Sequence, residues 1–232
     1  MGRVVRAALE EMRRNVVPGV STEELDSVCT RTFDTHGARA APALVYGFPG
    51  TACISVNNEA VHGIPGPRKL ENGDLVKLDV TAELDGYFAD AAITVPVAPM
   101  TPQRLRLVRC ARNALHKATG TATAGRPMNV IGRSVQSEVE RQGFNIMPAF
   151  RGHGVGRTIH EAPSVHNYYA PRDKEPLTKG LVLAIEPVIS AGSGMSRDIG
   201  DGWTIVTADG TDSAHFEHTV VITRGRPLVL TA

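Results

Sequence analysis

The stretch GDLVKLDVTAELDGYFADAAITVPV, residues 73–97, predicts a β-hairpin at the centre of the fold. Apolar and β-branched residues dominate two runs of similar length, which is typical of strands. Between the runs stands the dipeptide Asp85–Gly86, which is favoured in two-residue hairpin turns. A turn at this place puts Asp79 and Asp90 on neighbouring strands. We therefore expect these two carboxylates to lie close enough to share a ligand.

Two helices are expected before the hairpin, over residues 3–16 and from Ser21 to about Gly37. Apolar residues recur at helical spacing in the first segment. In the second, Ser21 is followed three residues later by Glu24, which is the pattern of a capping box. A short strand, ACISVNN, is expected at residues 52–58, between the second helix and the hairpin.

The second half of the chain repeats this order. Residues 102–119 and about 127–142 predict helices, and LVLAIEPVIS, WTIVTADG and SAHFEHTVVIT predict strands. In each half a turn leads into an apolar strand with one carboxylate, and a later strand carries another. Glu186 and Glu217 are the pair in the second half. This agreement in order indicates an internal duplication of an α+β unit.

Four carboxylates in the expected strands are the most informative feature of the sequence: Asp79, Asp90, Glu186 and Glu217. Acidic residues are rarely buried without a partner. A salt bridge or a polar sheet face explains any one of them, but few lysines or arginines stand beside the four. Two unit charges 4 Å apart repel by about 4 kcal/mol at an effective dielectric of 20. A cluster of four therefore requires protons or cations.

His153 and His160 stand in a segment that contains three glycines, FRGHGVGRTIHEAP, at residues 150–163. Glycine inside a helix or strand costs roughly 0.5–1 kcal/mol relative to alanine, so backbone here is expected to approach another group. Oxygen ligands with one imidazole suit Mn, Fe, Co or Zn, and shared carboxylates suit a pair of such ions. A structural calcium site is the alternative, although histidine is an unusual calcium ligand. The other histidines have no informative spacing and are expected at surface or polar core positions: His36, His116, His166, His215 and His218.

Composition excludes several classes of function. The 232 residues carry 25 Lys and Arg against 24 Asp and Glu, so no basic patch indicates nucleic-acid binding. Three widely spaced cysteines without a CxxC motif indicate a reducing compartment. No apolar run is long enough for a membrane span, and the N-terminal residues have no signal-peptide pattern. We expect a cytoplasmic protein that binds neither nucleic acid nor membrane.

The segments NNEAVHGIPG, KLDVTAELDGYFAD, GHGVGRTIHEAP, AIEPVI and HFEHTVVIT occur in an order and spacing that resemble a known family. The chain resembles the type I methionine aminopeptidases of the pita-bread, or creatinase–aminopeptidase, superfamily over nearly its whole length. The resemblance implies one catalytic domain, residues 1–232, with an α+β pita-bread fold. Its two pseudo-symmetric halves, about 1–100 and 101–232, are each expected to have two helices packed on a curved, mainly antiparallel sheet.

The resemblance also implies a site with two divalent metal ions, from among Mn, Fe, Co and Zn. Asp90 and Glu217 are expected to bridge the ions, and Glu186 is expected to act as a general base as well as a ligand. The full ligand set implied by the family is Asp79, Asp90, His153, Glu186 and Glu217.

Two histidines and three pocket residues complete the implied site. His160 is expected to contact the scissile carbonyl, and His62 to help protonate the leaving amine. The glycines around His153 are expected to leave room for metals and peptide. The methionine side chain is expected to bind at Phe48, Cys53 and Trp203, for each of which a plain core role is the alternative.

The implied activity is removal of the initiator methionine from nascent polypeptides whose second residue is small. A monomer with transient ribosome association is expected. A superfamily sister acting on Xaa-Pro bonds is one alternative, but such enzymes usually carry a second histidine where this chain has Arg157. A non-catalytic peptide-binding module is another, but modules of that kind usually lose ligands. Members of the family usually have roughly a dozen more residues at the N-terminus, so a shortened first helix is expected.

Overall fold

The computed structural model describes the whole chain, residues 1–232. Four of its five helices match the predicted ones: α1 (Gly2–Asn15), α2 (Thr22–His36), α4 (Pro102–Thr121) and α5 (Asn129–Arg141). The predicted capping box is present at the start of α2, because the Ser21 side chain accepts from the Glu24 N–H and the Glu24 carboxylate accepts from the Ser21 N–H. The short helix α3 (Ala41–Tyr46) has no counterpart among the predicted elements.

The strands form four sheets, and every pairing between them is antiparallel. Strands β1 to β5 belong to the first half of the chain, and β6 to β15 follow α5. Their bounds are β1 (Arg39–Ala40), β2 (Cys53–Val56), β3 (Glu59–Val61), β4 (Leu75–Leu84), β5 (Tyr87–Pro96), β6 (Asn145–Ile146), β7 (Arg151–Gly154), β8 (Glu161–His166), β9 (Val182–Ile185), β10 (Val188–Ser190), β11 (Ser196–Asp198), β12 (Ile205–Thr207), β13 (Ser213–His215), β14 (His218–Val221) and β15 (Leu228–Val229).

The predicted hairpin is confirmed as β4 and β5, the two longest strands. Its two-residue turn has positive φ at both positions, 55° at Asp85 and 78° at Gly86, as a turn that matches the strand twist requires. The register pairs Asp79 with Ala92 and Thr81 with Asp90. The two carboxylates are therefore diagonal neighbours on adjacent strands.

Two segments that were predicted as single strands are each broken at a carboxylate. LVLAIEPVIS divides into β9 and β10 at Glu186 and Pro187. Proline has no N–H to donate to a ladder, so it ends regular pairing. SAHFEHTVVIT divides into β13 and β14 at Phe216 and Glu217, because the Glu217 N–H leaves the sheet and donates to the Ala92 carbonyl of β5 at 2.9 Å. Two of the four carboxylates thus lie in breaks between strands.

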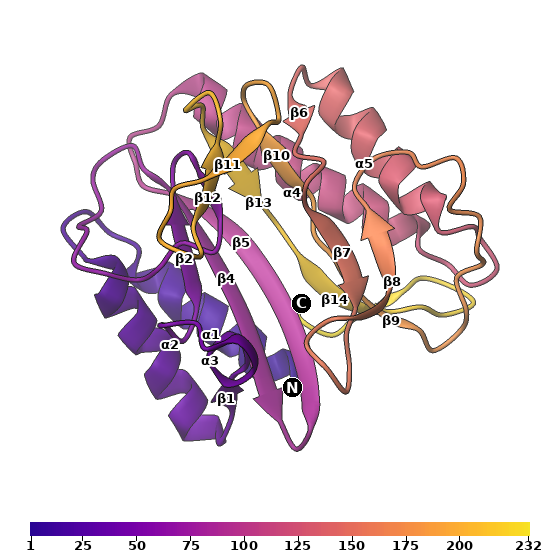
Figure 1. The fold of residues 1–232 in the computed structure, drawn as a ribbon, viewed down its shortest axis with the longest axis horizontal. Coiled ribbons are helices and arrows are strands. Elements are labelled where there is room, and N and C mark those ends of the chain that lie inside the picture. The colour runs from indigo at the N-terminus through magenta and orange to yellow at the C-terminus, as the bar shows by residue number, and fades with distance from the viewer.

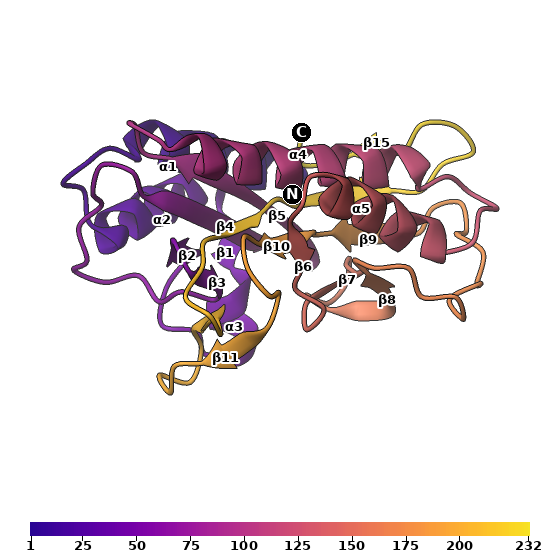
Figure 2. The same ribbon diagram turned by 90° about the horizontal axis from the view of Figure 1, so that it is seen from above.

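The four long helices, α1, α2, α4 and α5, lie on one side of the sheets (Figures 1 and 2). Each half of the chain has its own apolar core. One cluster of 20 buried residues lies wholly within the first half, under α1 and α2. The other cluster, of 23 buried residues, is built almost entirely from the second half, under α4 and α5. The α+β fold with two similar halves, each with two helices on an antiparallel sheet, is confirmed.

The two halves meet where β5 lies beside β14. The Asp90 N–H donates to Thr219 Oγ1 at 2.9 Å, and the Thr219 hydroxyl donates back to the Asp90 carbonyl at 2.8 Å. Together with the bond from the Glu217 N–H to the Ala92 carbonyl, these contacts join β5 to β14 and to the residue just before it. The backbone at two of the four carboxylates is thereby fixed by the junction itself.

A buried ion group fastens α4 to α5. The Glu138 side chain is fully buried and accepts hydrogen bonds from Lys117 of α4, from Arg141 at 2.7 Å and from Gln142 at 3.2 Å. Burial alone would raise the pKa of Glu138, but these hydrogen bonds outweigh it and lower the pKa to about 2. The folded state therefore holds this carboxylate ionised.

We expect Glu138→Gln to lower the free energy of unfolding by roughly 1.5–3 kcal/mol at pH 7, because charge-assisted bonds to a buried group are lost. The pKa is about 2 in the folded chain and near 4.5 ordinarily, so the carboxylate stabilises the fold above that ordinary value. Its contribution is lost as the pH falls toward 2. Urea denaturation should show a smaller difference in the free energy of unfolding between parent and variant at pH 3.5 than at pH 7.

Glu140→Gln is the matched control, since Glu140 is exposed on the same helix and bonds only to Gln136. Its effect should stay within about 0.5 kcal/mol. Equal effects of the two substitutions would contradict a special role for the Glu138 group.

Candidate metal centre

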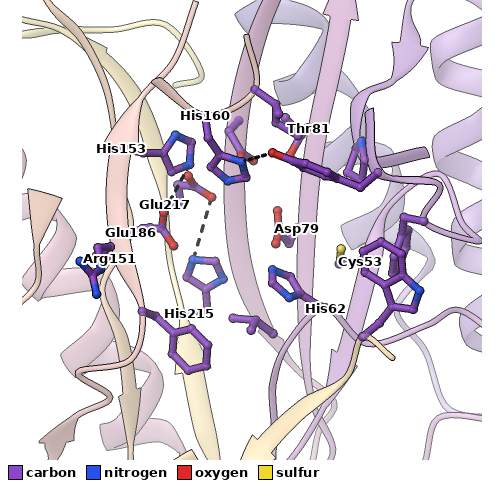
Figure 3. Close-up of a pocket in the computed structure, with 18 of the residues that line it drawn as sticks. Cys53, His62, Asp79, Thr81, Arg151, His153, His160, Glu186, His215 and Glu217 are labelled. Carbon is purple, nitrogen blue, oxygen red and sulfur yellow. Dashed lines mark hydrogen bonds and ion pairs between the residues drawn. The ribbon is translucent and has the colours of Figure 1, made fainter. Parts of the chain in front are cut away.

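One pocket, of about 260 Å³, lies between the two halves of the chain and contains all of the predicted site residues. Figure 3 shows Cys53, His62 and Asp79 of the first half facing His153, Glu186 and Glu217 of the second. The predicted residues that line the pocket are Phe48, Cys53, His62, Asp79, Asp90, His153, His160, Glu186, Trp203 and Glu217.

His153 occupies β7, between β8 and β9 in the sheet. Its Nδ1 lies 2.8 Å from the Gly154 carbonyl oxygen, which can only accept, so Nδ1 carries the proton. The Nε2 lone pair is then free and lies 3.5 Å from Glu186 Oε1. A histidine that binds metal is commonly oriented in this way, by a backbone carbonyl at its other nitrogen.

The carboxylates come from different elements that converge on this imidazole. Ligand atoms of Asp90, His153 and Glu217 all lie within 4.8 Å of one another. Asp79 and Glu186 line the same pocket but fall outside this group of three. Asn167, which is buried, donates to the Glu186 carbonyl at 2.9 Å and so fixes the chain at the break after β9.

Crowding and burial disfavour the ionised form of all four carboxylic acids. Burial raises the pKa of Asp90 to about 6, against the opposing effect of a hydrogen bond from Thr81. Burial raises the pKa of Asp79 well above its usual range, and the Asp90 charge raises it further. Burial, and then the charges of the neighbouring carboxylates, also raise the pKa of Glu186 and of Glu217 well above the usual range.

No lysine or arginine forms an ion pair with this cluster, although Arg151 lines the same pocket. Two histidines lie beside its carboxylates: His153 Nε2 is 3.5 Å from Glu186, and His215 Nε2 is 3.9 Å from Glu217. The buried Lys77 of β4 donates instead to the Asn57 carbonyl at 2.6 Å. Burial lowers the pKa of both histidines, so neither supplies a fixed positive charge.

The residues present fit divalent metal ions. Asp90 Oδ1 and Glu217 Oε1 are buried without any hydrogen-bond partner, which is costly for an anionic oxygen. A free imidazole nitrogen lies beside them. Cys53 is the one cysteine in the lining, and burial raises its pKa, so it is a neutral thiol and not a thiolate. This oxygen-rich set with one imidazole is typical of first-row transition-metal ions.

His62 and His160 lie on the rim of the carboxylate cluster. Enclosure in the pocket, and then the charge of a neighbouring imidazole, lower the pKa of each, so both are neutral imidazoles near pH 7. His62 follows β3 with an unusual positive φ of 58°, which turns it into the pocket. The His160 ring stacks edge-on against His153, with centroids 4.2 Å apart.

An apolar wall stands beside the cluster. Phe48 and Trp203 pack edge to face, with ring centroids 5.1 Å apart. Cys53 is paired with Asp79 across β2 and β4, so it joins this wall to the carboxylates. Ile159 is also buried in the lining.

The structure adds four polar side chains that the sequence did not point to. Thr81 and His215 each stand two residues from a predicted ligand, on the same face of an extended segment, and the period of two could have identified them. His215 is 2% exposed, and neither ring nitrogen has a partner. Arg151 carries the same signal, because it stands two residues before His153 on β7. Tyr46 carried none, because it lies at the end of α3 and meets the pocket through a contact with the other half of the chain.

The expectation that the glycines around His153 leave room for metals and peptide is wrong for two of the three. A Cβ at Gly152 would lie 2.2 Å from the Ala184 carbonyl oxygen of β9. One at Gly154 would lie 2.3 Å from the Ala162 carbonyl oxygen of β8. These glycines let β7 pack closely between its two neighbours, and the third glycine, Gly156, has only ordinary contacts.

Comparison with known proteins decides the family. Residues 1–224 match metallopeptidase family M24. The chain belongs to metallopeptidase family M24. It is 44% identical to methionine aminopeptidase 2 of Bacillus subtilis, with 100% of this chain and 94% of that protein aligned.

Solved structures agree with this assignment. A methionine aminopeptidase of Thermotoga maritima superposes with a TM-score of 0.96 at 38% identity, over 99% of this chain and 93% of that one. A prolidase of Pyrococcus furiosus shares the fold, with a TM-score of 0.79 at 21% identity. The superposition covers 100% of this chain and 61% of the prolidase chain. The pita-bread prediction is confirmed.

None of the helices has the length and apolarity to cross a bilayer.

We expect Gly152→Ala to lower the free energy of unfolding by roughly 1–3 kcal/mol, because the new methyl group has no space against the β9 backbone. Gly156→Ala is the matched control, since its Cβ would meet nothing closer than 3.6 Å. Urea denaturation of both variants measures the difference. Equal stability of the two would contradict the close-packing explanation.

We expect Asp90→Asn to make the metal-free protein more stable than its parent at pH 8, by roughly 1–3 kcal/mol. An acid whose pKa is raised by folding destabilises the fold above its folded pKa, here about 6. This destabilisation disappears below the ordinary aspartate pKa of 3.8. The difference in the free energy of unfolding between parent and variant should therefore shrink as the pH falls from 6 to 4. Urea denaturation across this range tests it.

Metal should reverse the order of stability, because a ligand that binds only the folded state stabilises it. Adding Mn or Co at pH 8 should raise the melting temperature of the parent more than that of Asp90→Asn. Equal shifts would argue against Asp90 as a ligand.

Proposed function

We propose that this chain is a methionine aminopeptidase that removes the N-terminal methionine from polypeptides whose second residue is small. The observation that carries the proposal is a pocket in which the five residues expected as metal ligands converge beside an apolar wall. The full-length similarity to methionine aminopeptidases of known structure and sequence supports it. Residues 1–232 act as a single catalytic domain in this proposal.

Five residues would hold two divalent metal ions, from among Mn, Fe, Co and Zn: Asp79, Asp90, His153, Glu186 and Glu217. The two buried oxygens without partners support the inclusion of Asp90 and Glu217 in this ligand set. When bound, the ions supply positive charge that offsets the carboxylates and makes water more acidic.

Three side chains handle protons and hydrogen bonds during the cleavage. Glu186 accepts a proton from the attacking water as general base, a role for which its raised pKa suits it. His160 donates a hydrogen bond to the carbonyl oxygen of the scissile bond, where negative charge develops. His62 lies on the opposite side of the pocket mouth and helps protonate the leaving amine.

Selectivity for methionine comes from the apolar wall. Phe48, Cys53 and Trp203 enclose the first side chain of the substrate, and burial of a methionine contributes about 1.5–3 kcal/mol relative to exposure. The edge-to-face pair of Phe48 and Trp203 keeps this wall rigid. A flexible, polarizable thioether packs well against such aromatic rings.

The substrate class places the enzyme with nascent polypeptides, and we propose that it acts as a cytoplasmic monomer in transient association with ribosomes. The prolidase of Pyrococcus furiosus is only 21% identical to this chain, so its similarity shows a shared fold and does not indicate a shared activity. Arg157, where Xaa-Pro enzymes usually have histidine, stacks on Tyr87 at 3.9 Å and is not among the residues that line the pocket.

We expect metal-stripped protein to be inactive on Met-Ala-Ser and to release methionine after Mn, Fe, Co or Zn is added. Asp90→Asn should reduce kcat/KM at least about 100-fold, since even residues behind the ligands of a metal commonly cost 10- to 100-fold. Chromatographic detection of free methionine measures both effects. Asp34→Asn, an exposed carboxylate of α2 outside the pocket, is the matched control and should keep full activity.

Ala-Pro-Ser separates the alternatives. Its cleavage in preference to Met-Ala-Ser would move the chain to the Xaa-Pro enzymes. Tight peptide binding without turnover in any of the four metals would support a binding module instead.

A further inference from the structure

Tyr46 reaches across the mouth of the pocket to His160. Its hydroxyl oxygen lies 2.6 Å from His160 Nδ1, and the dashed line at His160 in Figure 3 marks this hydrogen bond. The two residues are 114 positions apart, one in each half of the chain. Neither the ligand set nor the methionine pocket makes use of Tyr46.

The end of α3 holds Tyr46 in place. Gly47 follows it with a φ of 73° and ends the helix, with its N–H donating to the Ala43 carbonyl. The next residue, Phe48, is buried and packs against Trp203. Tyr46 itself is 48% exposed, so the hydroxyl contact closes the rim of the pocket and contributes little to the core.

The backbone around His160 is already fixed without Tyr46. The Thr158 hydroxyl donates to the His160 carbonyl at 2.9 Å, and the Arg157 and Thr158 N–H groups donate to the Glu161 carboxylate. Ile159 is buried beside it. The remaining freedom of His160 is rotation of its ring, and the bond at Nδ1 removes that freedom.

The direction of this hydrogen bond determines which nitrogen of His160 carries the proton. The Tyr46 hydroxyl has no other hydrogen-bond partner, and a phenol is a good donor to an imidazole lone pair. The opposite tautomer would aim an Nε2 lone pair at a pocket lined by four carboxylates. Repulsion between that lone pair and the carboxylates favours a proton on Nε2.

We infer that Tyr46 is a positioning residue, whose hydroxyl donates to His160 Nδ1 and directs the Nε2–H of His160 toward the carbonyl oxygen of the bound peptide. This inference rests on the proposed function, in which His160 contacts that carbonyl. The Nε2–H bond strengthens as charge develops on the oxygen, so its alignment acts on kcat. Substrate binding depends on it much less, so KM is expected to change little.

Tyr46→Phe removes the hydroxyl and keeps the ring. We expect kcat on Met-Ala-Ser to fall about 3- to 10-fold, which corresponds to the loss of one neutral hydrogen bond, with KM nearly unchanged. Tyr169→Phe is the matched control, because its hydroxyl has no partner and its ring stacks under Arg133 at 4.3 Å, a contact that phenylalanine preserves. Its kcat and KM should equal those of the parent.

Nitrogen NMR of the zinc-loaded protein with ¹⁵N-labelled histidine provides a readout that does not depend on turnover. His160→Gln assigns the His160 signals. In the parent, Nδ1 of His160 should appear as an unprotonated, hydrogen-bonded nitrogen and Nε2 as a protonated one. In Tyr46→Phe the Nδ1 signal should move to the position of an unbonded nitrogen, and in Tyr169→Phe it should stay.

A lower kcat together with the Nδ1 shift supports the inference. An unchanged Nδ1 signal overturns it, because Tyr46 is then not the partner of His160. A shifted signal with unchanged kcat, or a higher KM alone, also overturns it and leaves Tyr46 as a contact of the pocket rim. A parent protein inactive with every metal would overturn the proposed function, and the NMR comparison would still decide the bond between Tyr46 and His160.

Discussion

Four carboxylates share one pocket without a lysine or arginine to neutralise them, and this constraint governs the rest of the structure. Their repulsion and desolvation oppose folding, and burial raises the pKa of each of them. The chain meets this cost with two separate apolar cores, one under each pair of helices. Divalent cations remove the cost when they bind, so metal binding and fold stability are coupled at this site.

The junction between the halves turns this constraint into geometry. Asp90 and Thr219 exchange two hydrogen bonds, and the Glu217 N–H is bonded to the Ala92 carbonyl. The same backbone groups that join β5 to β14 therefore set the positions of two carboxylates. A movement of one half against the other would separate the carboxylates, so the hydrogen bonds that join the halves also hold this group together.

Much of the fold and of the candidate site could be predicted from local pattern. The turn at Asp85–Gly86 set the register of the central hairpin, and the capping box at Ser21 set the start of α2. Every predicted site residue lines one pocket. The prediction failed where contacts between distant segments decide the outcome. The breaks at Glu186 and Glu217 and the packing of Gly152 against Ala184 depend on neighbours far away in the sequence.

The sequence by itself determined the elements, their order and the set of acidic and imidazole side chains, because hydrophobic period and turn chemistry are local properties. Only the tertiary structure decided which of these side chains meet. It brought His153 Nε2 to 3.5 Å from Glu186 Oε1, and the Tyr46 hydroxyl to 2.6 Å from His160 Nδ1. Tyr46 and His160 lie in segments that no periodic pattern relates, so their contact exists only once the two halves have packed together.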